Sequence, residues 1–284
     1  MTKKIILTLS LLMVNACGVA NTTDISWRKL DPKHTVLMTL PQGKVVIELA
    51  PQFSPKHVAQ FEKLANEHFY DNTTFYRVIN GFVAQAGPKD GSEKDKSVPI
   101  LKVEDQWTTN KDFLFTKVQS NDLYAQQTGF SNGFAIAHSP KEQKAWLTHC
   151  PGTLAMARES GPDTASSHFY FVIGQSPRYL DRLMTIFGRV VYGMEHIQSI
   201  KRTSTIEGEF AVDSREHTKI ISMQLMSEVA KEQQIIIEVE DTASQNFAKR
   251  LTKTKDRENE FFYNKPPPVL DVCQISVRSR MSKK

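Results

Sequence analysis

Residues 75 to 87 read FYRVINGFVAQAG, with a β-rich run on either side of the dipeptide Asn80-Gly81. Aromatic and β-branched residues favour strands, and an Asn-Gly pair favours a tight turn. We therefore expect strands at residues 74–79 and 82–85. Arg77 precedes Gln85 by eight positions, so the turn would bring a permanent cation and an amide side chain onto neighbouring strands.

The sequence around this stretch contains further strand patterns and few helices. Residues 36–40 and 45–49 are β-rich and flank a Pro/Gly turn, which predicts a hairpin. Ser54 precedes Pro55, a typical helix start, and residues 55–68 place apolar side chains on one helical face. More strands are expected at residues 152–157, 169–173, 185–191 and 219–226, and a short helix at 194–200. Many strands with few helices favour a closed sheet, because closure removes exposed strand edges.

Composition and charge exclude several classes of protein. The chain has 284 residues, 40% of them hydrophobic and 24% charged, as in an ordinary folded protein. Thirty-six basic residues against 31 acidic ones leave a net charge of +5, and the acids are scattered along the chain. A nucleic-acid partner is therefore not expected. The histidines show no HExxH or comparable spacing, so we expect no metal.

The N-terminus has the pattern of a signal peptide. Lys3 and Lys4 precede an apolar run over residues 5–14, and we assign residues 1–20 to a signal peptide. Two processing routes stay open: lipidation at Cys17, in a sequence similar to a bacterial lipobox, or cleavage near Ala20. Both predict export to the periplasm, with the mature chain either soluble or lipid-anchored through Cys17. Residues 21–33 are polar and are predicted to be a tether.

Two further regions differ in character from the strand-rich part. Residues 88–148 are polar with weak periodicity, and we interpret them as an irregular insertion. Residues 230–284 form a C-terminal extension with α/β character: a strand-like run at 235–239, a charged helix opened by a capping-box pattern at 242–245, and an apolar segment after three prolines.

The block at residues 75–87 resembles the signature of cyclophilin-type peptidyl-prolyl isomerases, Phe-His-Arg-Val-Ile-x-Gly-Phe-x-x-Gln-Gly-Gly. Residues 152–158, GTLAMAR, and 166–173, SSHFYFVI, are similar to the family's second block. A third piece, YLD at residues 179–181 followed by IFGRV at 186–190, resembles the strand region before the second helix. The similarity covers residues 34–229 and is greatest to exported members from Gram-negative bacteria.

The resemblance implies a fold, an activity and a site. The fold is a mainly β, closed eight-stranded antiparallel barrel with two helices over residues 34–229, followed by the α/β extension. The activity is cis-trans isomerisation of X-Pro bonds in proline-containing unfolded or nascent exported polypeptides, with no cofactor and with a monomeric enzyme. A fixed cation stabilises the twisted amide, whose proline nitrogen gains a lone pair. Arg77, Phe82 and Gln85 match the family's catalytic positions.

The remaining family positions imply substrate-binding residues. They would form the apolar proline pocket and its rim and hold the substrate backbone, and they are Val83, Ala157, Arg158, His168, Tyr170, Tyr179, Leu180 and Met184. Tyr170 stands where the family commonly has phenylalanine, and His168 where it has glutamine. Because Arg77, Phe82 and Gln85 are retained, these departures are expected to affect the isomerisation rate and the peptide preference.

The cysteines predict one disulfide. Without Cys17, the mature chain keeps Cys150 and Cys273, and an oxidising compartment favours a bridge between them. Such a bridge would join the extension to the barrel. The alternative is two separately buried thiols.

Two other functions compete with the isomerase. The first is a non-catalytic or slow cyclophilin-like chaperone that binds peptides, favoured by the altered rim and the long insertion. The second is an acyl hydrolase, suggested by G-x-S-x-G at residues 129–133. That motif needs a strand before it and a helix after it, and neither flank has the required pattern.

Overall fold

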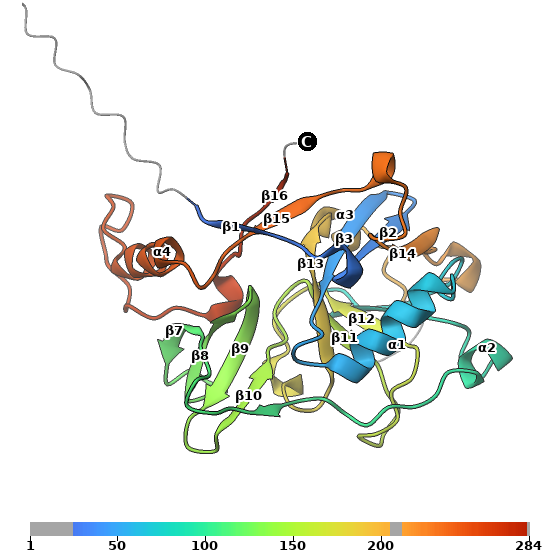
Figure 1. Ribbon diagram of the computed structural model, residues 1–284, viewed down its shortest axis with the longest axis horizontal. Helices are drawn as coiled ribbons and strands as arrows, with labels where there is room; N and C mark the ends of the chain where they lie inside the picture. Colours follow the sequence, from blue (N-terminus) through green and yellow to red (C-terminus); the bar gives the residue numbers. More distant parts are fainter. Residues whose placement is uncertain (1–24, 205–211, 283–284) are drawn as a thin grey trace, which may run out of the picture.

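The computed structural model describes residues 25–204 and 212–282, and it is built mainly of β-strands (Figure 1). Its main sheet has eight strands, each antiparallel to its neighbours. In spatial order they are β14 (Ser222–Leu225), β2 (Thr35–Leu40), β3 (Gly43–Leu49), β13 (Ile186–Tyr192), β11 (Thr153–Met156), β12 (Phe169–Val172), β5 (Val83–Gly87) and β4 (Thr74–Val78). The eight antiparallel strands expected from the sequence are confirmed.

The closure of this sheet differs from the expectation. Strands β14 and β4 are its two ends, and they share no ladder. The residues just before β14 join them through an isolated bridge between Thr74 and Lys219 and through a hydrogen bond from the Ile220 amide to the Thr73 carbonyl (2.8 Å). The sheet is therefore a curled half-barrel rather than a closed barrel, because β14 pairs with β2 but not with β4.

The inside of the curled sheet holds the main core. Helix α1 (Pro55–Asn66) buries Val58, Phe61, Leu64 and Ala65 there, as the sequence predicts, and it ends two residues earlier than expected. Ser54 precedes the helix, but its hydroxyl donates to the Ile186 carbonyl (2.6 Å) instead of capping the first turn. A short helix, α3 (Met194–Gln198), lies close to β3.

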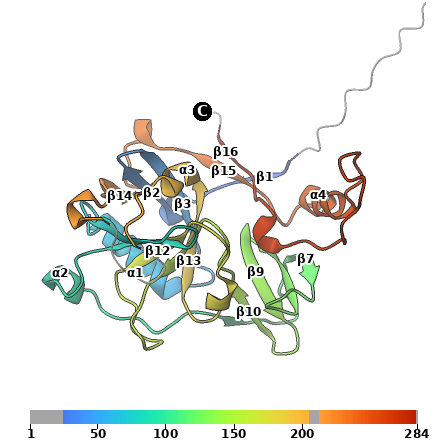
Figure 2. The same cartoon turned by 180° about the vertical axis from the view of Figure 1, so that it is seen from behind.

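The insertion is folded, which corrects the sequence interpretation of residues 88–148. After a single-turn helix, α2 (Glu93–Lys96), it forms a second antiparallel sheet beside the half-barrel (Figure 2). In spatial order its strands are β6 (Trp107–Thr108), β10 (Lys144–Leu147), β9 (Phe134–Ser139), β8 (Gln127–Ser131) and β7 (Thr116–Ser120). These strands are short, so their alternation extends over too few residues to stand out from a polar sequence.

The G-x-S-x-G motif covers the end of β8 and the turn between β8 and β9. Asn132 and Gly133 have φ angles of 48° and 82°, and Ser131 pairs with Phe134 across a two-residue turn. This geometry is typical of a type I′ hairpin. A strand, not a helix, follows the motif, and the nucleophile elbow of an acyl hydrolase is absent at these residues.

The extension adds a third sheet and a helix. Strands β1 (Trp27–Lys29), β15 (Ile237–Glu240) and β16 (Ser279–Met281) form the sheet in that order. Part of the predicted tether is thus a strand. The sequence did not predict it, because its partner β15 lies about 200 residues away and neither segment reveals the pairing locally. Helix α4 (Gln245–Asp256) begins at Ser244, whose hydroxyl accepts from the Phe247 amide (3.1 Å), two residues after the predicted cap.

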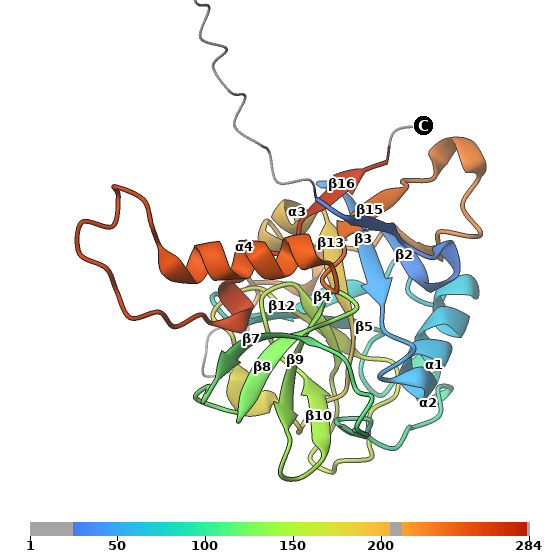
Figure 3. The same cartoon turned by 60° about the vertical axis from the view of Figure 1, so that its left-hand side comes forward.

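The extension packs on the insertion rather than standing free. Phe247 and Leu251 of α4 share an apolar cluster with Val118 and Phe130 of the five-stranded sheet, and Figure 3 shows α4 lying across β7 and β8. The predicted disulfide is present: Cys150 and Cys273 are bonded, with their Cα atoms 4.9 Å apart.

In the described part of the chain, five short 3-10 helices connect these elements. They are η1 (Pro32–His34), η2 (Arg178–Leu180), η3 (Ser214–Glu216), η4 (Lys231–Gln233) and η5 (Val272–Gln274). No helix within residues 25–204 and 212–282 is long and apolar enough to cross a membrane. The signal peptide at 1–20 and the lipidation at Cys17 concern residues outside the described part.

Candidate active site

Strand β4 carries two consecutive polar side chains on the outer face of the half-barrel. Phe75 pairs with Ala86 and Arg77 pairs with Gln85, so Tyr76 is an extra residue in β4. Such a bulge shifts the alternation of side chains by one position. Phe75 can therefore face the core while both Tyr76 and Arg77 face outward.

A row of outer-face residues crosses three neighbouring strands. Gln85 of β5 pairs with Arg77 of β4 on one side and with Tyr170 of β12 on the other. The structure thus brings together Arg77, Gln85 and Tyr170, which are separated by up to 93 positions in the sequence. Their roles in catalysis stay predictions.

Hydrogen bonds link this row to a chain of polar groups. The Arg77 guanidinium donates to the Gln85 carbonyl oxygen (3.3 Å), and the Gln85 amide nitrogen donates to the Tyr76 hydroxyl (2.6 Å). Tyr76 lies 2.7 Å from His168 Nδ1, and His168 Nε2 lies 3.0 Å from an oxygen of Asp95. Burial raises the pKa of Tyr76 to about 12, so its hydroxyl stays protonated at neutral pH. The side chain of Gln85 is therefore held at both ends.

Arg77 keeps its positive charge without a carboxylate partner. Among the described residues it forms no ion pair, and its one side-chain hydrogen bond goes to the neutral Gln85. The guanidinium is half-buried beside an apolar surface. A cation that is fixed but not neutralised can interact with a developing lone pair.

Three of the four apolar residues predicted for the proline pocket fall into one cluster: Phe82, Val83 and Tyr170 belong to it, and Leu180 does not. Ala157 and Met184 belong to it too, together with residues from the inner face of the five-stranded sheet. Val83 is 3% exposed and Tyr170 4% exposed, so they form a covered floor. Phe82, Ala157 and Met184 remain partly exposed and offer the accessible surface.

The remaining predicted residues lie at the rim. Tyr179 and Leu180 belong to η2, and Tyr179 is 61% exposed. Arg158 donates to the backbone carbonyls of Leu183, Glu159, Ser160 and Gly161, so it holds its own loop rather than pointing freely toward a substrate. His168 does not line the apolar cluster but continues the polar chain from Tyr76.

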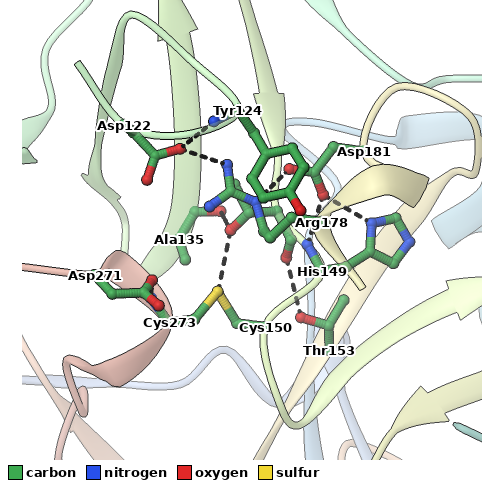
Figure 4. Close-up of polar contacts among 11 residues, drawn as sticks. Asp122, Tyr124, Ala135, His149, Cys150, Thr153, Arg178, Asp181, Asp271 and Cys273 are labelled. Carbon is green, nitrogen blue, oxygen red and sulfur yellow. Dashed lines mark hydrogen bonds and ion pairs between the residues drawn. A yellow bond between two sulfur atoms is a disulfide. The ribbon is translucent and has the colours of Figure 1, made fainter. Parts of the chain in front are cut away.

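A second polar chain, which the sequence did not reveal, supports the floor. The Tyr170 hydroxyl lies 2.9 Å from His149 Nε2, and His149 Nδ1 lies 2.9 Å from Asp181. Asp181 also accepts from Arg178 (2.5 Å), which contacts Asp122 of the insertion (3.2 Å). Figure 4 shows this chain from His149 to Asp122 beside the disulfide. Burial raises the pKa of Tyr170 well above its usual range, so its hydroxyl remains a neutral hydrogen-bonding group.

One cluster has the residue types of a metal site. Asp90, Asp95 and His168 place ligand atoms within 4.8 Å of one another. Both ring nitrogens of His168 are already engaged, by Tyr76 and by Asp95. His168 and Asp95 therefore belong to the polar chain from Gln85.

Replacing Tyr170 by phenylalanine is expected to destabilise the fold more than it lowers the activity. The apolar ring would remain, but the buried His149 would lose its Nε2 partner, which costs about 1–3 kcal/mol of unfolding free energy. Urea unfolding and isomerase assays on the same sample would measure both effects. Tyr179→Phe, at an exposed tyrosine, is the control and should change stability by less than about 0.5 kcal/mol. A Tyr170→Phe variant as stable as the wild type would show that this hydrogen bond contributes nothing.

Comparisons with known proteins agree on the family. Residues 35–225 match the family described as cyclophilin type peptidyl-prolyl cis-trans isomerase/CLD. A probable peptidyl-prolyl cis-trans isomerase of Brucella suis is 34% identical over 178 residues, which cover 62% of this chain and 76% of the relative. Peptidyl-prolyl cis-trans isomerase B of Bacillus subtilis is 32% identical over 158 residues, covering 56% of this chain and 83% of the relative.

A solved structure extends the similarity beyond the family region. The crystal structure of cyclophilin AquaCyp293 from Hirschia baltica is similar with a TM-score of 0.71 and 26% sequence identity. It covers 91% of this chain and 95% of its own length, so the shared architecture includes most of the insertion and the extension. The chain belongs to the cyclophilin-type peptidyl-prolyl cis-trans isomerases, and it is an enzyme of that class.

Proposed function

We propose that this isomerase accelerates X-Pro isomerisation in unfolded polypeptides that have been exported to the periplasm. Arg77 carries the proposal: it is a half-buried cation that forms no ion pair with the described residues, and Gln85 fixes it at the edge of an apolar surface. Facing the proline nitrogen, it would stabilise the twisted amide more than either planar form. Phe82 would contact the proline ring, and Gln85 would bind the substrate backbone.

Export is supported by two features of the chain. Residues 3–14 have the pattern of a signal peptide, and the disulfide between Cys150 and Cys273 suits an oxidising compartment. The enzyme would then reach its substrates either as a soluble periplasmic monomer or from a membrane surface through a lipid on Cys17. Mass spectrometry of the mature N-terminus would decide between these routes.

Isomerase activity should be measurable with a protease-coupled assay on an Ala-Pro peptide. We expect a first-order acceleration of the cis-to-trans step that is proportional to enzyme concentration, because only the trans form is cleaved. The same protein with Arg77→Ala serves as the control for contaminating isomerases. An unchanged isomerisation rate at micromolar enzyme would contradict the proposal.

A slow, peptide-binding chaperone is the second candidate, and one observation favours it. Val83 and Tyr170, which would line the proline pocket, are almost fully covered, and the inner face of the insertion sheet belongs to the same apolar cluster. Such a chaperone would suppress the aggregation of a proline-containing client without accelerating its isomerisation. Light scattering measured beside the protease-coupled assay separates the two functions.

A further inference from the structure

A cavity of about 680 Å³ lies where the half-barrel, the insertion and the extension meet. Each part contributes a wall: Gly81, Phe82 and residues 174–179 from the half-barrel, residues 122–124 from the insertion, and Asp271, Cys273 and Gln274 from the extension. A volume of this size is typical of ligand sites in proteins, which have about 300–1,000 Å³. We call it the junction groove.

Buried contacts hold the three walls in place. Arg178 is 5% exposed and joins Asp122 of the insertion to Asp181 of the half-barrel. Its guanidinium also lies 5.3 Å from the centre of the Tyr124 ring, a cation–π distance. The disulfide ties Cys273 of the extension wall to Cys150, and Figure 4 shows it next to Arg178 and Asp122. The groove is therefore built before any ligand binds.

The groove presents three large side chains that are exposed. Leu123 is 87% exposed, and the rings of Tyr124 and Tyr179 are also exposed. All three line the groove. Exposed apolar residues that gather at a concave surface favour binding of an apolar or aromatic side chain.

The groove is continuous with the proposed proline pocket. Phe82 belongs to the apolar cluster that holds Val83 and Tyr170, and it also lines the groove. A chain whose proline lay against Phe82 would extend by about 3.3–3.6 Å per residue, so within a few residues it would reach Tyr179 and the insertion wall.

The two carboxylates at the groove differ in whether a cation neutralises them. Asp122 is paired with Arg178, whereas Asp271 is exposed and forms no ion pair with any residue in the described part of the chain. One oxygen of Asp271 accepts from the Cys273 amide (2.9 Å), which leaves its charge uncompensated. A basic side chain on the ligand would complement this carboxylate.

We propose that the junction groove binds the polypeptide segment next to the substrate proline, and that it prefers a segment with an apolar or aromatic residue and a nearby lysine or arginine. This inference rests on the proposed function, because the substrate is the same polypeptide. The insertion and the extension thereby become parts of the substrate site, and the enzyme selects among X-Pro bonds by their flanking sequence.

The test compares two peptides with the same central Ala-Pro. One is a blocked tetrapeptide, and the other is a twelve-residue peptide with leucine, tyrosine and lysine on both sides of that centre. We expect the wild type to have a kcat/KM about tenfold higher for the long peptide, measured by NMR exchange spectroscopy. Leu123→Ala should reduce this advantage about fivefold, the scale expected for losing part of one buried leucine, with the tetrapeptide unaffected.

Two matched variants separate the apolar and the charged contributions. Leu114→Ala removes a leucine of the same insertion that is 84% exposed but does not line the groove, and it should behave as the wild type. Asp271→Asn keeps the oxygen that accepts from Cys273 and removes the charge. It should lower the advantage about twofold to threefold at low salt, and the difference should shrink as salt is added.

The outcomes distinguish the groove from the isomerase function. If Leu123→Ala and Asp271→Asn process the long peptide as the wild type does, the groove proposal is wrong even though the enzyme is active. If the wild type does not accelerate the tetrapeptide, the proposed function fails. Fluorescence anisotropy of the labelled long peptide then tests the groove alone: weaker binding by Leu123→Ala supports it, and unchanged binding overturns it.

Discussion

Replacing Arg77 by alanine is expected to lower kcat/KM for an Ala-Pro peptide by about 100-fold to 1,000-fold. That is the usual effect of losing one preorganised donor, about 2.7–4 kcal/mol of transition-state stabilisation. The guanidinium has no carboxylate to neutralise it among the described residues, so its charge is available to the proline nitrogen. The protease-coupled assay measures the change.

The fold of the Arg77→Ala variant should be retained. Arg77 makes one side-chain hydrogen bond, and Gln85 would still donate to Tyr76. Arg77→Lys should also be strongly impaired, because a flexible ammonium does not reproduce the planar donor fork. Arg215→Ala removes an exposed arginine elsewhere on the chain and should leave activity unchanged. Near-full activity of Arg77→Ala with an unchanged melting curve would refute the catalytic assignment of Arg77.

Removing the disulfide is expected to lower the free energy of unfolding by about 2–5 kcal/mol. The bond spans 123 positions, and closing so long a loop removes much of the entropy of the unfolded chain, about 4–5 kcal/mol in the chain-entropy model. It also joins η5 of the extension to the residues before β11. Urea unfolding of the variant Cys150→Ala/Cys273→Ala, compared with the oxidised wild type, measures the loss.

Two comparisons test whether the missing disulfide causes the loss of stability. The wild type unfolded in the presence of a reductant should approach the stability of the double variant, because both lack the cross-link. Circular dichroism should show that the double variant keeps its β-rich fold, since the half-barrel core is separate from the cluster around Cys150. A double variant that unfolds at the wild-type urea concentration would show that packing alone holds the extension in place.

Much of the half-barrel could be predicted because its helix has a regular apolar pattern and its strands are rich in aromatic and β-branched residues. The apolar face of α1 repeats over twelve residues, and β-rich runs lie on both sides of Asn80-Gly81. The block resemblance placed Arg77, Gln85 and Tyr170 in one site, and the sheet register makes them neighbours.

The insertion sheet was missed although one local signal was present. Asn132-Gly133 lies between two strands and forms the tight turn that such a pair favours. The same residues belong to a G-x-S-x-G motif, which suggests a catalytic serine instead of a hairpin. The other turns lack so clear a signal, and strands as short as β6 cannot be recognised from alternation.

The sequence by itself determined the class of enzyme and the cation and amide of its candidate site, and it predicted the bridge between Cys150 and Cys273. These depend on residue types and on their order along the chain. The tertiary structure decided that β1 pairs with β15, that His149 and Asp181 support Tyr170, and that three separate segments enclose the junction groove. Such contacts join residues far apart in the chain. They arise only when the elements pack and their buried polar groups find partners, and no local pattern records that packing.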